Sequence, residues 1–347
     1  MGETGKKRLS SVDILRAIGI IIMVAGHVGF GGKFDRYIHT FHMPLFFVLS
    51  GFLYRGKKDI PAGRLIADRA RRLLVPYLFY GAVNYIFWFF LDRGTGESWY
   101  GPLIKLFTYN TDHLPICGAL WFLTALFWCE LVYILLDRLI KIPGVRIAVI
   151  TVIAAGFAVM QNYTDIRLPL SFDNGMVCLL FYEAGRLAHD TKGSWGKFTD
   201  RLKPAVCMAF AVVLLPVTIG LAFVNSYVNI KSGWYGIIPL FYLNAILGTI
   251  MCLMAALFLD RAFKDKNVLK ITLVNTGSGT MVFLGLNQLV ILLLNRGCGA
   301  VTAFTGKELN FYPMQAIITV LALAVLYIIL LTVRKIKTKT SKMLFGI

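Results

Sequence analysis

Residues 13–27, Asp13-Ile-Leu-Arg-Ala-Ile-Gly-Ile-Ile-Ile-Met-Val-Ala-Gly-His27, place a cation and an imidazole within the first long apolar segment of the chain. Arg16 and His27 are eleven residues apart, so on a helix turning about 100° per residue their side chains fall within about 20° of each other, about 16 Å apart along the axis. Such groups are costly in hydrocarbon, so we expect both to face a protein interior or a wet cavity. Asp13, three residues before Arg16, is expected to neutralise and orient it.

The whole chain is as apolar as this segment. Of its 347 residues 57% are hydrophobic, and the mean hydropathy is +0.69, which is typical of a polytopic membrane protein. We expect an all-α bundle of about ten transmembrane helices, each near the length that crosses about 30 Å of hydrocarbon. The expected spans are residues 11–30, 41–54, 73–91, 116–136, 144–160, 172–188, 204–224, 235–258, 272–295 and 312–333. The second is short and contains Pro44 and Gly51, so we expect a bent or partly re-entrant helix there.

The net charge of +18 follows the expected topology. With the N-terminus inside, the cytoplasmic segments hold 27 of the 36 Lys and Arg residues and the outer loops hold eight. Positive residues concentrate in cytoplasmic loops, so both termini are predicted to be cytoplasmic. The cations stand at span ends rather than on a separate soluble face, and this excludes nucleic acid as the partner that the charge would indicate.

The chain reads as one transmembrane domain, residues 1–347, with a basic cytoplasmic tail at 334–347 that is a possible linker to a further domain. Lys6, Lys7 and Arg8 lead into a span too long and too polar for a cleaved signal peptide, so we expect that span to remain. The six cysteines, Cys117 included, lack CxxC or Cys/His ligand spacing. They predict neither a disulfide framework nor a metal site.

Two histidines and a serine are candidates for chemistry in the first two spans. His27 lies between Gly26 and Val28, and an imidazole is the usual general base near neutral pH; the alternative is a structural histidine bonded to a neighbouring helix. His42 begins the second span and Ser50 nearly ends it. His42 either orients His27, contacts substrate or caps its helix.

A basic cluster follows in the loop before the third span. Arg69, Arg71 and Arg72 exceed what topology requires, and they bind either the phosphates of a cytoplasmic ligand or the anionic headgroups of membrane lipid. Glu130 is predicted to lie well inside the fourth span, beyond Trp121, and is the intramembrane acid that we would test.

The ordered set of motifs resembles the acyltransferase 3 family of integral membrane acyltransferases. The motifs are Asp13-Ile-Leu-Arg16 with His27, Phe41-His-Met-Pro-Leu-Phe-Phe-Val-Leu-Ser-Gly-Phe52, Arg71-Arg-Leu-Leu-Val-Pro-Tyr77, Gly118-Ala-Leu-Trp-Phe-Leu-Thr-Ala-Leu-Phe127, Tyr182-Glu-Ala-Gly185 and Thr276-Gly-Ser-Gly-Thr280. They run over nearly the whole chain and agree with ten spans.

The resemblance implies transfer of an acyl group, acetyl foremost, from cytoplasmic acyl-CoA to a hydroxyl or amine of a cell-envelope acceptor, in a bacterial plasma membrane. It implies that Arg16 and His27 are the family's Arg-x10-His pair, with His27 as the base, and that Arg69, Arg71 and Arg72 lie near the donor's phosphates. Direct transfer and an acyl-histidine relay both remain open. Trp121, His42, Ser50 and Glu130 are assigned to substrate contact or support.

One departure from the family pattern falls in the ninth span. Asn287 or Gln288 stands where many members are expected to have a histidine, so both are candidates for substrate contact. The Leu-Asn-Gln-Leu-Val stretch also resembles the membrane part of VanT-type membrane-bound serine racemases, in which a racemase domain would follow residue 347. Two alternatives to an acyltransferase thus remain, a carrier of L-serine or a similar small amino acid, and a family member that binds lipid or acyl-CoA without turnover.

Overall fold

The structure is a computed structural model that describes residues 10–56, 59–94, 98–111, 114, 118–190, 202–305, 311–336 and 338–346, and these are almost entirely helical. The long helices are α1 (Ser10–Val28), α4 (Ala62–Leu91), α6 (Trp121–Leu139), α7 (Pro143–Tyr163), α11 (Pro204–Val224), α12 (Ile238–Ala262), α14 (Thr280–Thr305) and α15 (Phe311–Lys335). The shorter ones are α2 (Gly32–Ile38), α3 (His42–Leu53), α5 (Gly101–Phe107), α8 (Phe172–Val177), α9 (Leu179–Asp190), α13 (Val268–Ser278) and α16 (Lys339–Phe345), with a 3₁₀ turn at Pro169–Ser171. The all-α prediction is confirmed.

Seven helices of the described chain are long and apolar enough to cross a membrane, namely α1, α4, α7, α11, α12, α14 and α15. The other three expected spans are helical but differ from a simple crossing. Helix α3 has 12 residues, or about 18 Å; α6 carries three charged residues; and the sixth segment divides at Cys178 into α8 and α9. Crossing by these three segments therefore stays a prediction. Pro44 lies in the first turn of α3, where no amide bond is lost, so the expected bend is not needed.

Two boundaries differ from the prediction. The basic segment before the third span was expected to be a loop, but α4 begins at Ala62, so Arg69, Arg71 and Arg72 lie on a helix. The expected ninth span, 272–295, is divided at Gly279 into α13 and α14. Both changes matter for function, because they fix the directions in which the polar side chains of these segments point.

Glycines allow the closest helix contacts near the centre of the bundle. A Cβ atom at Gly51 of α3 would lie 1.9 Å from the Tyr182 carbonyl oxygen, and one at Gly185 of α9 would lie 1.9 Å from that of Val48. A Cβ atom at Gly277 of α13 would lie 1.7 Å from the Asp13 carbonyl oxygen of α1. Small residues of this kind let helix backbones approach in membranes. The last contact holds α13 against the part of α1 that carries Arg16.

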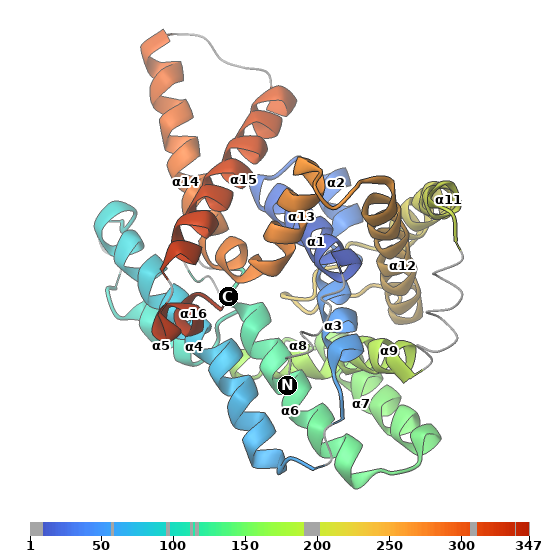
Figure 1. Ribbon diagram of the computed structural model, residues 1–347. Helices are drawn as coiled ribbons and strands as arrows, with labels where there is room; N and C mark the ends of the chain where they lie inside the picture. The colour runs from blue at the N-terminus through green and yellow to red at the C-terminus, as the bar shows by residue number, and fades with distance from the viewer. Residues whose placement is uncertain are drawn as a thin grey trace, which may run out of the picture.

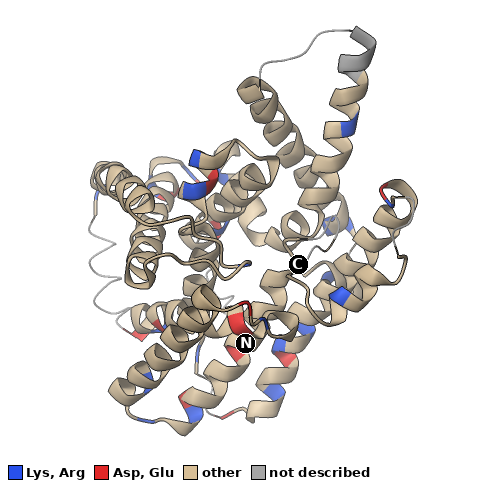
Figure 2. Ribbon diagram, turned by 180° about the vertical axis from the view of Figure 1, so that it is seen from behind, with Lys and Arg blue, Asp and Glu red and all other residues tan. Residues whose placement is uncertain are grey.

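Figure 1 shows α1, α3 and α13 in the middle of the assembly, α11 and α12 paired at one side, and α14 and α15 extending together beyond the rest. The C-terminal helix α16 lies against α4 (Figure 1). The long helices carry few charged residues along their length (Figure 2). Several residues discussed from the sequence, Lys6, Lys7, Arg8, Cys117 and part of the basic tail, lie outside the described residues.

A buried ionic network joins three helices on the side of α3 away from α1. Arg146 of α7 contacts Asp137 of α6 at 2.6 Å and Glu183 of α9 at 3.1 Å. Tyr133 donates a hydrogen bond to Glu183, and Tyr54 donates one to Asp137 at 3.2 Å. Glu183 is 1% exposed, so this carboxylate depends on its partners for stability.

Candidate functional site

A cavity of about 710 Å³ lies between α1, α3, α4, α6, α13, α14 and α16. Its volume is within the range of pockets that hold small-molecule ligands. The charged and hydroxyl side chains of its lining are Arg16, Ser50, Asp68, Arg69, Arg71, Arg72, Glu130, Ser278, Thr280, Lys339 and Lys342. Six of these are cations and two are acids, so the lining as a whole favours an anionic ligand.

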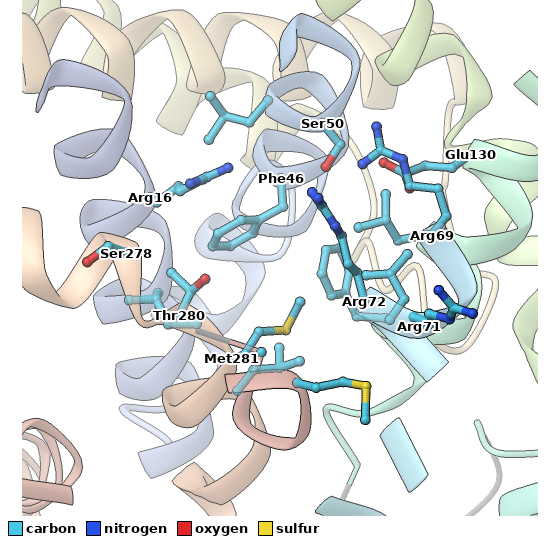
Figure 3. A pocket seen from close by; sticks show the side chains of 18 of the residues that line it. Arg16, Phe46, Ser50, Arg69, Arg71, Arg72, Glu130, Ser278, Thr280 and Met281 are labelled. Carbon is cyan, nitrogen blue, oxygen red and sulfur yellow. The ribbon is translucent and has the colours of Figure 1, made fainter. Parts of the chain in front are cut away.

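The arginines of α4 that line this cavity differ in their contacts and in the direction of their side chains. Arg69 Nε lies 3.4 Å from Glu130 Oε2, and the Glu130 side chain is 4% exposed. Arg72 follows Arg69 by three residues and so shares its helix face. Figure 3 shows the guanidinium of Arg72 directed toward the centre of the cavity, while that of Arg71 is directed away. In the described part of the chain the side chains of Arg71 and Arg72 form no ion pair, so their donors remain available to a ligand.

Arg16 reaches the same cavity from the opposite wall (Figure 3). Its Nη1 lies 3.4 Å from Asp13 Oδ1, and its side chain is 31% exposed while that of Asp13 is 2% exposed. The buried Asp13 carboxylate lies behind Arg16, and Arg16 presents the accessible charge. The cavity places Arg16, Ser50, Glu130 and the α4 arginines together.

The cavity also has an apolar lining. Ile20 lies one turn beyond Arg16 on α1, Leu284 lies on α14, and Phe46, Phe122 and Leu126 come from α3 and α6. A ligand with an anionic head and an apolar or weakly polar arm would match a lining of this kind.

His27 and Gln288 form a second polar group farther along the same two helices. Gln288 Nε2 lies 3.1 Å from His27 Nδ1, and Gln288 Oε1 accepts a hydrogen bond from the Gly118 amide at 2.6 Å. Because a backbone N–H only donates, it sets the orientation of the amide, and Nε2 must donate to His27. The neutral imidazole then carries its proton on Nε2, with the Nδ1 lone pair held by Gln288.

Three further side chains, Lys231, His39 and His42, lie in the region of this pair. An ideal Cβ at Gly118 would lie 3.2 Å from Lys231 Nζ, which brings this lysine beside the Gln288 amide. The His39 and His42 rings stack edge to face with centroids 5.1 Å apart. His42 donates from Nδ1 to the Ile38 carbonyl at 2.7 Å, so the lone pair of the neutral ring is on Nε2. Burial lowers the pKa of His39, against the opposing hydrogen bond to Asp35.

Lys231 and Gly118 were not found by sequence reasoning. Lys231 stands in a turn of ordinary composition, Asn229-Ile-Lys-Ser-Gly-Trp234, and Gly118 acts through its backbone. Only the contact with Gln288 reveals them, although the motif that begins at Gly118 marked the region.

Two predicted residues take positions apart from both groups. Asn287 is 1% exposed, and its Nδ2 donates to the Phe283 and Leu284 carbonyls of its own helix at 3.0 and 2.7 Å. Trp121 is buried and packs edge to face on Phe122 with ring centroids 6.4 Å apart. Of the two candidates in α14, Gln288 is therefore the one that meets His27.

The site combines a cationic cavity, which suits an anionic ligand, with a histidine group farther along α1 and α14. The family model for acyltransferase 3, described as an acyltransferase domain, matches residues 9–333. Neither the curated proteins nor the solved structures contain a match to this chain. With nearly all of its helices inside the matched range, the chain belongs to the acyltransferase 3 family of integral membrane acyltransferases.

Proposed function

We propose that this membrane acyltransferase transfers an acyl group, acetyl foremost, from cytoplasmic acyl-CoA to a hydroxyl or amine of an extracytoplasmic acceptor. The observation that carries the proposal is the cavity that Arg16, Arg69 and Arg72 enter and that Arg71 also lines (Figure 3). Guanidinium groups bind phosphate through paired, charge-assisted hydrogen bonds. The phosphates of the donor would lie at this end of the cavity.

From the cavity, helices α1 and α14 lead toward His27. From Ile20 to His27 there are seven residues of α1, and from Leu284 to Gln288 four residues of α14, or about 10 Å and 6 Å along the two helices. An extended thioester arm is long and thin enough to pass between helices over one or two turns. Its carbonyl would then lie between the cationic cavity and the histidine group.

The chemistry proposed for this carbonyl is a single acyl transfer. The acceptor oxygen or nitrogen forms a bond to the acyl carbon, the carbon–sulfur bond breaks, and the acceptor proton passes to His27 and then to the departing thiolate. Since Gln288 holds the Nδ1 lone pair, the acceptor would take the place of the amide N–H when it gives its proton. Arg16 would steady the donor, and Lys231 offers a positive charge near the acceptor.

The sidedness of the proposal agrees with the contacts of each group. The cavity is lined by Arg69–Arg72 and by Lys339 and Lys342, which the charge distribution assigns to the cytoplasmic side. His27 lies among Gly118, Lys231 and His39, which belong to segments assigned to the outer side. Both termini would be cytoplasmic in this arrangement.

The test is binding and turnover of acetyl-CoA by the purified protein in detergent. His27→Ala is expected to abolish transfer while the protein stays folded, because alanine fits a helix. Arg16→Lys keeps the charge but loses the planar fork, so lost turnover would indicate directional contacts. Turnover retained by His27→Ala would remove His27 from the mechanism.

A different result would favour the alternative function. If the unchanged protein binds no acyl-CoA of any chain length, the proposal fails. Carriage of L-serine or a similar small amino acid, toward a racemase domain fused or bound to the C-terminus, would then be measured as uptake into proteoliposomes.

A further inference from the structure

We propose that the C-terminal helix α16 is the closing wall of the donor site, and that Lys339 and Lys342 bind phosphate groups of the donor. This inference rests on the proposed function, since it assigns a ligand to the same cavity. It concerns residues beyond the family domain, because the matched region ends at residue 333 and α16 spans Lys339–Phe345.

One face of α16 lines the cavity. Lys339, Lys342, Met343 and Gly346 belong to the lining, and their spacing of three, four and seven residues is that of one helix face. The side chains of both lysines are exposed, and in the described part of the chain neither forms a hydrogen bond or ion pair. Two exposed cations thus line a cavity that is also lined by four arginines.

The opposite face of α16 is anchored to α4. The Phe345 ring meets Phe79 edge to face with centroids 4.9 Å apart, and the Tyr80 hydroxyl donates to the Phe345 carbonyl at 3.3 Å. At the start of the helix, the Thr338 hydroxyl accepts from the Ser341 amide at 3.1 Å. These contacts give the tail a fixed position, which a solvated linker would not have.

The charge of the cavity explains what the lysines would bind. Asp13 pairs with Arg16 and Glu130 with Arg69, so Arg71, Arg72, Lys339 and Lys342 face only one further acid of the lining, Asp68. A cluster of unpaired cations is repulsive unless an anion joins it. A ligand with several phosphates would bridge the helix of the arginines and the helix of the lysines.

Anionic lipid headgroups carry the same phosphate chemistry, so the experiment separates the two sources. Acetyl-CoA binding is measured calorimetrically in nanodiscs of phosphatidylcholine alone, which contain no anionic lipid, for the unchanged protein and for Lys339→Ala, Lys342→Ala and the double variant. The matched control is Lys335→Ala, which removes an exposed cation of the same tail that does not line the cavity.

We expect alanine at either lysine to weaken acetyl-CoA binding about fivefold, and the double variant to weaken it about 25-fold. These values correspond to the loss of exposed charge pairs of good geometry. Lys335→Ala should bind as the unchanged protein does, and Lys342→Arg should retain most of the affinity. Phe345→Ala, which releases the anchor of α16, should weaken binding about as much as the double variant.

Two results would overturn the inference. If the double variant binds acetyl-CoA in phosphatidylcholine discs as well as Lys335→Ala does, α16 is not part of the donor site. If the lysine substitutions change only the effect of added phosphatidylglycerol on acetyl-CoA binding, the lysines bind lipid instead. Both results leave the proposed function standing as long as Arg72→Ala weakens binding, whereas absence of acetyl-CoA binding by the unchanged protein would refute that function itself.

Discussion

The ion pair between Arg69 and Glu130 gives a prediction that separates a structural role from a ligand-binding one. Glu130 is 3% exposed, and Arg69 Nε lies 3.4 Å from its Oε2 atom. Arg69→Ala leaves this carboxylate buried without its partner, and breaking a buried pair in this way costs about 3–5 kcal/mol. Because Arg69 is 29% exposed and the contact is long, we expect about 3 kcal/mol.

The second variant removes the cause of that loss. Glu130→Gln in the Arg69→Ala background keeps the shape of the side chain and abolishes its charge, so most of the 3 kcal/mol should return. Thermal unfolding in detergent measures both effects. Arg69→Ala should lower the melting temperature by roughly 4 °C, and the double variant should recover most of it. Arg71→Ala is the control, because Arg71 forms no ion pair among the described residues and should leave the melting temperature unchanged.

Acetyl-CoA binding by the same proteins reports the other role. If Arg69 also contacts the donor, the double variant should bind acetyl-CoA about fivefold more weakly than the unchanged protein even though its stability has recovered. Equal melting temperatures for Arg69→Ala and the double variant would refute the reasoning, because the two side chains would then not be coupled.

The remaining predictions concern the outer group, the ionic network and the charge of the cavity. Gln288→Leu should lower the transfer rate about tenfold with little change in KM, because the Gly118 amide loses its acceptor and His27 its donor; steady-state kinetics would check this, and an unchanged rate would argue against a positioning role. Arg146→Ala should cost about 3–5 kcal/mol, because Glu183 and Asp137 lose their common partner; a melting temperature equal to that of the unchanged protein would contradict it. Acetyl-CoA affinity should fall steadily as salt rises, and affinity independent of salt would count against phosphate binding by the cationic wall.

The sequence was most informative where local pattern determines structure. The expected span 204–224 agrees with α11, because Pro204 begins 21 residues that contain no charge and are apolar except for Thr218. The shared face of Arg16 and His27 follows from spacing alone: Arg16 lines a cavity that Thr280 of α14 also lines, and His27 contacts Gln288 of the same helix. Hydropathy was less reliable at α6, where Glu130, Asp137 and Arg138 share one helix.

Residues whose positions depend on packing could not be placed from the sequence. Asn287 and Gln288 are neighbours, about 100° apart on a helix, and only the rotation of α14 against α1 decides which meets His27. The cations before the third span were expected to lie in a loop, yet they lie in the first turns of α4. Arginine is a good helix former, and no glycine or proline interrupts residues 64–72. The basic tail reads as a linker, and its folding depends on Phe79 and Tyr80, more than 250 residues away in sequence.

The same packing argument explains why the spacing of the first helix matters more than the identity of its apolar residues. Arg16 lines the cavity beside α4 and α16. His27 contacts Gln288, which accepts a hydrogen bond from the Gly118 amide. Helices α1 and α14 each carry residues of both groups. One residue more or less between Arg16 and His27 would turn the imidazole by about 100° away from Gln288, and no repacking of the intervening apolar side chains would return it. The ten-residue interval is therefore a geometric requirement of the proposed mechanism, in which the donor site and the acceptor site share one helix face.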